Sequence, residues 1–242
     1  MKLLSISILL CLSSCSLVEE VTTNFSLSNG NTTSAPSLTN EEAISGLKEA
    51  LNIGIKNAVS LSSVKDGFFK NDIIRLPFPP DAIKVREKAL NLGLSNQVAT
   101  FEETMNRAAE EATLKAVPIF VDAIKNMSVS DGFSILKGGD GSATKFLKSQ
   151  TSNQLVLAFA PVVKESTSKV QLTAYWNPII SKYNTAMAIS GGQKLNPDLD
   201  AYITQKAIDG LFYLVEIEEN KIRKDPLARV SDILVKVFGS LF

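Results

Sequence analysis

The sequence predicts an all-α protein, in which a single compact multi-helix domain follows a flexible N-terminal tether. Apolar residues recur at helical spacing beyond Asn40, as in the series Leu47, Leu51, Ile55 and Val59. No stretch shows the sustained alternation or the density of β-branched residues that a sheet requires. About 200 residues follow Asn40, which is enough to build one hydrophobic core.

Residues 1–14 have the pattern of a lipoprotein signal peptide. Lys2 precedes a short apolar run, Leu3 to Leu12, which suits a secretory signal but is shorter than the roughly 20 residues of a membrane-spanning helix. Leu12-Ser13-Ser14-Cys15 then looks like a lipobox, with a branched apolar residue and two small residues before the cysteine. We therefore expect cleavage before Cys15 and its lipidation with diacylglyceryl and palmitate-type acyl chains. The alternative is an ordinary signal peptide with a leftover thiol.

Two or more acyl chains hold a protein stably on a membrane, so Cys15 is predicted to be a membrane anchor and not a ligand. Residues 15–38 are rich in Ser, Thr and Asn, a composition typical of a flexible tether. Ser16 stands where an aspartate would favour the inner membrane. We expect a cell-envelope protein, anchored in the outer membrane and facing the periplasm, with the helical domain at residues 39–242.

Charge and composition exclude several classes of function. The chain has 25 basic and 25 acidic residues, so it lacks the basic excess typical of nucleic-acid binding, and we expect no nucleic-acid partner. It has no histidine, and both cysteines, Cys11 and Cys15, lie in the export region. Histidine-dependent nucleophiles, typical zinc sites and disulfides are therefore not expected in the domain. No motif indicates a cofactor or a metal.

The first helix is expected from Asn40 to Leu61, with Thr39 or Asn40 as N-cap and two glutamates in the first turn. A ridge of small residues, which includes Gly46 and Gly54, predicts close packing against other helices. A long loop with three phenylalanines and three prolines follows, around Phe68 and Phe78. Packing of these aromatic side chains onto the core is favoured over a recognition surface.

The remaining helices are predicted from periodicity, proline and glycine. Glycines at 93 and 138–139 are expected to end helices in the left-handed conformation, and Asp140 or Ser142 is expected to cap the helix after the Gly138–Ser142 turn. An anion site in that turn is the weaker alternative. The expected helices are 81–92, 95–126 bent at Pro118, 130–136, 142–148, 151–169 bent at Pro161, one starting at Asn196-Pro197 and one starting at Asp225-Pro226. The last helix is expected to pack its apolar side in the core, with Val230, Ile233, Leu234, Val237 and Phe238.

Charged residues near the C-terminus allow two interpretations. Asp209, Glu216, Glu218 and Glu219 form an acidic set that is usually a solvated helix face, with metal or acid/base chemistry as the alternative. The basic residues nearby are interpreted as cations that decorate the end of a helix. They are Lys221, Arg223, Lys224, Arg229 and Lys236.

Short motifs spread from Leu38 to Gly239 carry a resemblance to a known family. They are Gly46–Leu51, Asp66–Phe69, Ile74–Pro79, Leu136–Asp140 with Ala143-Thr144, Tyr175-Trp176, Asn196–Leu199, Asp209–Phe212 and Ile222–Lys224. In these the chain resembles the bacterial lipoprotein family catalogued as domain of unknown function 4197. The resemblance implies an exported, mostly helical domain, with no established activity or site residues to carry over.

Two functional hypotheses follow. The preferred one is a non-enzymatic docking or structural module of the envelope, held to the membrane through Cys15 and binding a protein, lipid or glycan partner. The alternative is a periplasmic hydrolase or metal-dependent enzyme built on carboxylates, either Asp209 with Glu216 or Asp122 with Asp140. The enzyme hypothesis predicts that these side chains converge in one pocket.

Overall fold

The computed structural model describes residues 38–91, 93–169, 172–192, 194–195 and 198–239. All regular structure in these ranges is helical and no strand occurs in them, which confirms the all-α prediction. The predicted signal peptide, Cys15 and residues 16–37 of the predicted tether lie outside the described residues. None of the described helices is long and apolar enough to cross a membrane.

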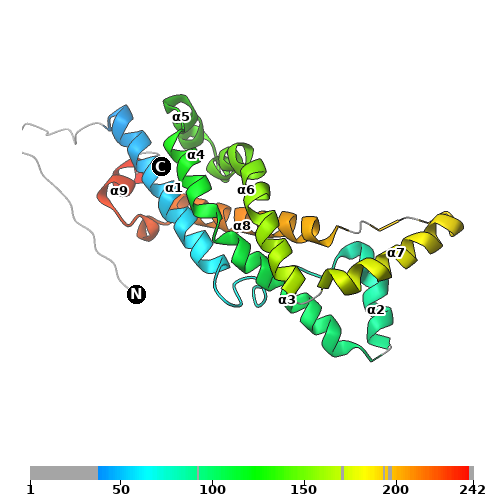
Figure 1. Ribbon diagram of the computed structural model, residues 1–242. Coiled ribbons are helices and arrows are strands. Elements are labelled where there is room, and N and C mark those ends of the chain that lie inside the picture. The colour runs from blue at the N-terminus through cyan, green and yellow to red at the C-terminus, as the bar shows by residue number, and fades with distance from the viewer. Residues whose placement is uncertain (1–37, 92, 170–171, 193, 196–197, 240–242) are drawn as a thin grey trace, which may run out of the picture. The chain divides into compact units, whose positions relative to one another are not determined.

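The helices occupy most of residues 40–239 (Figure 1). Two short 3-10 turns, η1 (Pro80–Ala82) and η2 (Pro226–Ala228), precede α2 and α9. The α-helices are α1 (Asn40–Ser62), α2 (Ile83–Asn91), α3 (Ser95–Thr113), α4 (Ala116–Lys125), α5 (Val129–Lys137), α6 (Ser142–Lys169), α7 (Leu172–Ser190), α8 (Leu199–Lys224) and α9 (Asp232–Gly239).

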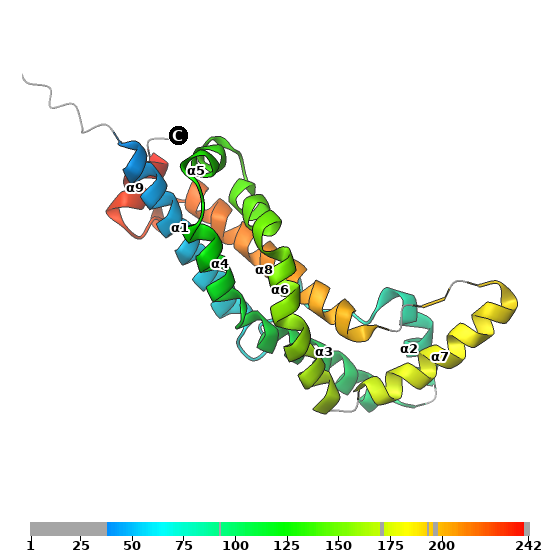
Figure 2. The same cartoon turned by 45° about the horizontal axis from the view of Figure 1, so that its top comes forward.

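The long helix α8 is the centre of the packing. It contacts α1, α3 and α6, and α4 closes the same core between α1 and α6 (Figure 2). Aromatic side chains fill the middle, where the rings of Phe120 on α4 and Phe212 on α8 meet edge to face with centroids 5.6 Å apart. The buried face of α8 includes Ala207, Leu211 and Val215, as its apolar periodicity predicts.

Helix α1 begins as predicted. The Thr39 hydroxyl accepts the Glu42 backbone N–H, and the Glu42 carboxylate accepts the Thr39 N–H at 2.9 Å, which forms a capping box. The small-residue ridge also packs as expected: a Cβ at Gly46 would lie 2.7 Å from Val237 of α9, and one at Gly54 would lie 3.4 Å from Glu218 of α8. The ridge therefore lets two helices approach α1 closely.

The loop from residue 63 to 79 packs its aromatic residues inward. Phe68 and Phe78 are buried, and Phe78 lies against Phe101 of α3 with ring centroids 4.8 Å apart. The core-packing interpretation is confirmed for these two side chains, and the alternative of a recognition surface built on them is wrong.

The structure has two helices where a single one was expected, in residues 95–126. The prediction of a single helix from 95 to 126, bent at Pro118, is wrong because the chain breaks at Leu114 and Lys115, between α3 and α4. A proline ring clashes with the carbonyl four residues earlier, here that of Leu114, and proline has no N–H to bond it. Pro118 is tolerated in the first turn of α4, where backbone N–H groups have no partner within the helix.

The structure has a single helix where two were expected, in residues 142–169. The segments predicted at 142–148 and 151–169 form the continuous helix α6, which also includes Pro161. The polar residues around the expected gap do not interrupt it, and their hydroxyls bond back to carbonyls of the same helix. Thr151 donates to Leu147 O at 2.7 Å and Ser152 donates to Lys148 O at 2.6 Å.

Helix α7 was not predicted. Its sequence contains an Asn177-Pro178 pair, and the residue before a proline is usually biased away from helix. The predicted N-cap of the next helix is also wrong: Asp198 and not Asn196 caps α8, with its carboxylate accepting the Ala201 N–H at 2.9 Å. Residues 196–197 themselves lie outside the described ranges.

The C-terminal segment differs from the prediction in two respects. Asp225 caps as expected, accepting the Leu227 N–H at 2.9 Å, but the structure that it starts is the 3-10 turn η2 and not the final helix. Helix α9 begins at Asp232 and buries Leu234, Val237 and Phe238 as predicted. Val230, which was expected in the core, is 70% exposed because it precedes α9.

The glycine-rich turn between α5 and α6 is a helix connection, but it is built differently from the prediction. The left-handed residue is Gly141, with φ of +73°, whereas Gly138 has an ordinary negative φ. Neither Asp140 nor Ser142 caps α6. A carboxylate from α8, that of Glu219, accepts the backbone N–H groups of Ala143 and Thr144 instead.

Candidate functional site

A groove lies where the C-terminal end of α8 meets α1 and the η2 turn. Its volume is about 290 Å³. Apolar and polar side chains share the lining, which is a composition typical of a surface that binds a ligand or a partner. The lining residues are Ile53, Asn57, Glu218, Lys221, Ile222, Asp225, Leu227, Ala228 and Val230.

The rim of the groove is unusually apolar. Leu227 is 91% exposed and Val230 is 70% exposed, while Ile222 forms a buried part of the wall. Single exposed apolar residues are common on proteins, but here two stand beside a concave site. Such a rim loses contact with water when a partner with an apolar surface covers it.

Local sequence explains why the rim residues point outward. Asp225 and Pro226 begin the η2 turn, in which the Asp225 carboxylate holds the Leu227 backbone N–H. Arg229 then folds back on α8, and its guanidinium donates to the carbonyl of Ile222 at 3.2 Å and to that of Arg223 at 2.8 Å. This fixes the turn against the helix and confirms that Arg229 serves the helix C-terminus.

The polar part of the groove is acidic. Asn57 of α1 donates through Nδ2 to Glu218 Oε2 at 2.7 Å, which links the two helices. Glu218 is only 7% exposed, whereas Lys221, one turn further along α8, is exposed. The groove thus has two carboxylates, those of Glu218 and Asp225, and one ammonium group.

A second charged cluster on the same helix serves the fold. Arg223 is buried and pairs with Glu219 at 3.0 Å, and it also donates to the carbonyl of Ile135 at 2.9 Å at the end of α5. Glu219 in turn caps α6 through Ala143 and Thr144. The pair therefore ties the ends of two helices to α8. The expectation of a solvated acidic face is wrong for Glu218 and Glu219, both of which are buried.

A third cluster holds the loop after α1. Glu110 of α3 is buried and accepts the backbone N–H groups of Phe68 and Phe69, at 3.1 and 3.2 Å. Arg107 bridges Glu110 at 2.8 Å and Asp66 at 2.6 Å. Hydrogen bonds from Lys70 and Arg107 lower the pKa of the Asp66 carboxyl below its ordinary value. These contacts hold the loop in place, so we assign them a structural role.

The four carboxylates of the enzyme hypothesis make contacts of different kinds, and none of them lines the groove. Asp209 accepts a hydrogen bond from Gln205 at 3.0 Å, and Asp140 pairs with Lys224. Glu216 is exposed and lies beside the Gly138–Ser142 turn, and Asp122 is exposed on α4. Within the described ranges, no three Asp or Glu side chains are grouped so that they would hold a metal ion.

Sequence reasoning missed the groove. Val230 was placed in the core, and Asn57 and Leu227 were not singled out. The one available signal was the Asp225-Pro226 pair followed at once by Leu227, since a cap and proline start a turn whose third residue has no helix face to join. That a side chain of α1 completes the site depends on tertiary packing, which the local sequence does not show.

The fold and the site define an all-α protein in which most buried charges are structural and a groove with an apolar rim is open to solvent. The chain belongs to the family described as "Protein of unknown function (DUF4197)", whose model matches residues 37–239. The predicted family is thereby confirmed. No curated protein and no solved structure matches the chain significantly.

Proposed function

We propose that this protein is a membrane-anchored lipoprotein of the bacterial envelope that works as a non-enzymatic docking module. The lipobox at Cys15 supports the anchor, and the groove between α1, α8 and η2 is the surface through which the module binds a protein partner. The observation that carries the docking role is the apolar rim, where Leu227 and Val230 stand exposed beside a concave site.

The placement of charges agrees with a docking role. The buried pair of Glu219 and Arg223 and the buried Glu110 are used to hold helix ends and a loop. The candidate carboxylates of the hydrolase alternative are spread over separate contacts. A binding surface requires only shape, apolar area and a few oriented polar groups, and the groove supplies these.

The anchor is tested by metabolic labelling with a palmitate analogue. We expect the wild-type protein and Cys11→Ser to carry the label and to partition with the envelope membranes. Cys15→Ser should lose both properties, because the thioether cannot form on serine. Cys11 is a matched control since it lies in the same export region, four residues before Cys15. Labelling of the Cys15→Ser protein would contradict the proposal.

The docking surface is tested by photo-crosslinking in cells. A photoreactive residue is placed at Leu227, or at Leu157 of α6, which is also highly exposed, at 77%, but does not line the groove. We expect one discrete adduct from position 227 and none of the same mass from position 157. Adducts of equal yield from both positions would indicate collisions and would overturn the assignment of the groove.

A further inference from the structure

The groove contains a buried carboxylate whose charge is not balanced by the described part of the chain. Of the three buried glutamates, Glu110 pairs with Arg107 and Glu219 pairs with Arg223. Glu218 is buried to the same degree, yet no ion pair among the described residues includes it. Its hydrogen-bond partner is the neutral amide of Asn57.

This arrangement is unfavourable for folding alone. A carboxylate that leaves water loses its hydration, and a single amide donor replaces only part of it. The fold shows elsewhere that it can place an arginine one turn from a buried glutamate, as in Glu219 and Arg223. Four residues after Glu218 the chain has Ile222 in place of an arginine, and Ile222 and Glu218 both line the groove. The site therefore has room for a positive charge supplied from outside.

The neighbouring polar groups do not fill that role. Lys221 lines the groove but is exposed, and no ion pair joins its ammonium group to the Glu218 carboxylate. Asp225 uses a carboxylate oxygen on the Leu227 N–H and adds to the negative charge. The groove thus keeps an acidic excess beside an apolar rim.

We propose that the groove binds an amphipathic peptide segment of a protein partner, with one lysine or arginine side chain reaching Glu218 and apolar neighbours covering Leu227 and Val230. This inference rests on the docking function proposed above and names the chemistry of the partner. A long basic side chain suits the site because its methylene stem packs along apolar residues while its charged end reaches the carboxylate. A free polyamine would leave the apolar rim exposed to water.

The test is a selection of displayed random peptides of about twelve residues against the full-length lipidated protein in detergent micelles, a length that suits recognition in a groove. We expect enriched peptides to share one lysine or arginine flanked by apolar residues. Binding of the enriched peptides should fall about ten- to a hundredfold in Glu218→Gln, as expected for loss of a buried charge-assisted contact. The matched control, Glu216→Gln, changes an exposed carboxylate two residues earlier on α8 and should bind like the wild type.

A second measurement separates binding from folding. The new side-chain amide of the Glu218→Gln variant keeps an oxygen that accepts the Asn57 amide, so this variant should melt at the wild-type temperature or above it while it binds the peptide more weakly. A clear drop in melting temperature would mean that the charge serves the fold, and would overturn the inference.

The outcomes also distinguish this inference from the docking function. If the enriched peptides lack a basic residue, or bind Glu218→Gln as well as the wild type, but lose binding in Leu227→Ser, then docking stands and the basic contact is wrong. A parallel selection uses the Leu227→Ser variant as the target. If the wild type enriches no peptide beyond those enriched by this variant, both proposals fail.

Discussion

Two adjacent glutamates of α8 show how strongly the surroundings of a single residue decide its role. Glu219 and Glu218 are both 7% exposed. Glu219 meets an arginine and the N-terminal N–H groups of α6, so its charge is compensated by the fold. Among the described residues, the hydrogen-bond donor to Glu218 is the Asn57 amide, and Glu218 lines the groove. One carboxylate is therefore structural, and the other is available to a partner.

Removal of the structural carboxylate should be costly. In Glu219→Ala, Arg223 stays buried without its partner and α6 loses the acceptor at Ala143 and Thr144, so we expect a loss of about 3–5 kcal/mol in the free energy of unfolding. Urea denaturation measures it. Glu216→Ala, which removes an exposed carboxylate from the same helix, should change that free energy by less than about 0.5 kcal/mol. Equal effects of the two substitutions would show that the buried pair contributes no more to the free energy of unfolding than an exposed carboxylate does.

Asp66 should contribute to stability in a pH-dependent way. Its pKa is lowered in the folded state by Lys70 and Arg107, so the unfolded chain binds the proton more tightly. The contribution is therefore present above the unfolded pKa of about 4 and is lost as the pH falls through the lower folded value. We expect the urea midpoints of wild type and Asp66→Asn to differ by a constant amount above about pH 5 and to converge below about pH 4. Asparagine tolerates the positive φ of 72° at this position, so the substitution adds no backbone strain to the comparison.

At the scale of elements, helix existence was largely predictable and helix boundaries were less so. The spacing of apolar residues and the cap at Thr39 predicted their elements because such signals are local. The cap at Asp225 was recognised, but it starts η2 and not the predicted final helix. Two of the wrong predictions rested on prolines. Pro118 was expected to bend a helix, but the chain breaks four residues before it. Pro178 contributed to the failure to predict α7. Whether a proline bends, ends or begins a helix depends on neighbouring helices that its own sequence does not specify.

Two glycines of α1 should respond in opposite ways to a methyl group. At Gly46 the new Cβ would lie 2.7 Å from Val237, so Gly46→Ala has to displace α9, and overpacking of this kind costs about 1–3 kcal/mol. At Gly54 the Cβ would make an ordinary contact of 3.4 Å, so the better helix propensity of alanine should stabilise the protein by up to about 1 kcal/mol. Melting temperatures of the two variants test this. A lower melting temperature for Gly54→Ala than for Gly46→Ala would contradict the packing described for α1.

For the whole molecule, the missing residue types set its response to solution conditions. The chain has no histidine, and histidine is the residue type whose ordinary pKa lies between about pH 5 and 8. We expect the urea midpoint to stay constant from about pH 5.5 to 8. The same titration should show no change on addition of a reducing agent, because both cysteines lie before residue 16. A sloping midpoint in this range would reveal a carboxyl or amino group with a strongly shifted pKa.

The candidate site was less predictable than the fold. The acidic residues on α8 were recognised as a set, but sequence spacing could not separate Glu218 and Glu219 from the exposed Glu216. That separation arises because α1 and the α5–α6 turn cover one side of α8. The groove also requires Asn57 and Glu218, which are 161 residues apart in the chain. Sites of this kind depend on the assembled core and have no local motif.

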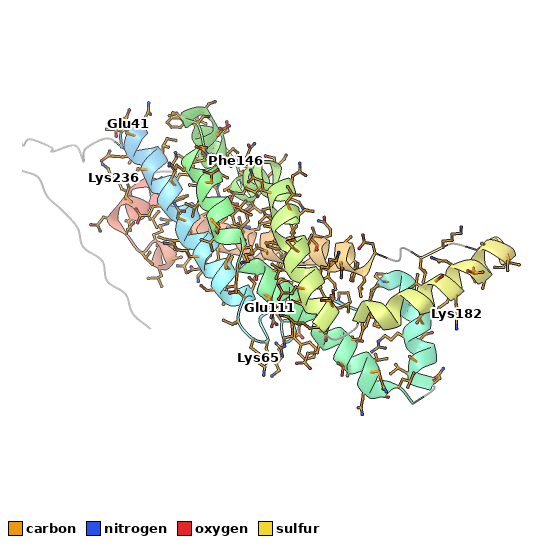
Figure 3. The ribbon with its side chains drawn as sticks, viewed as in Figure 1. Glu41, Lys65, Glu111, Phe146, Lys182 and Lys236 are labelled. Carbon is orange, nitrogen blue, oxygen red and sulfur yellow. The ribbon has the colours of Figure 1, made fainter. Side chains whose placement is uncertain are left out.

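The two ends of the described domain meet at one place, which bears on the anchor proposed at Cys15. Lys236 of α9 pairs with Glu42 in the first turn of α1 at 2.7 Å, and Figure 3 shows it lying near Glu41. Val237 packs against Gly46 one turn further on. A pulling force that enters the chain at residue 38 therefore acts first on a helix turn that α9 holds in place. With the proposed anchor, the C-terminal helix would brace this end of α1, and α1 in turn packs directly on α8 and lines the groove.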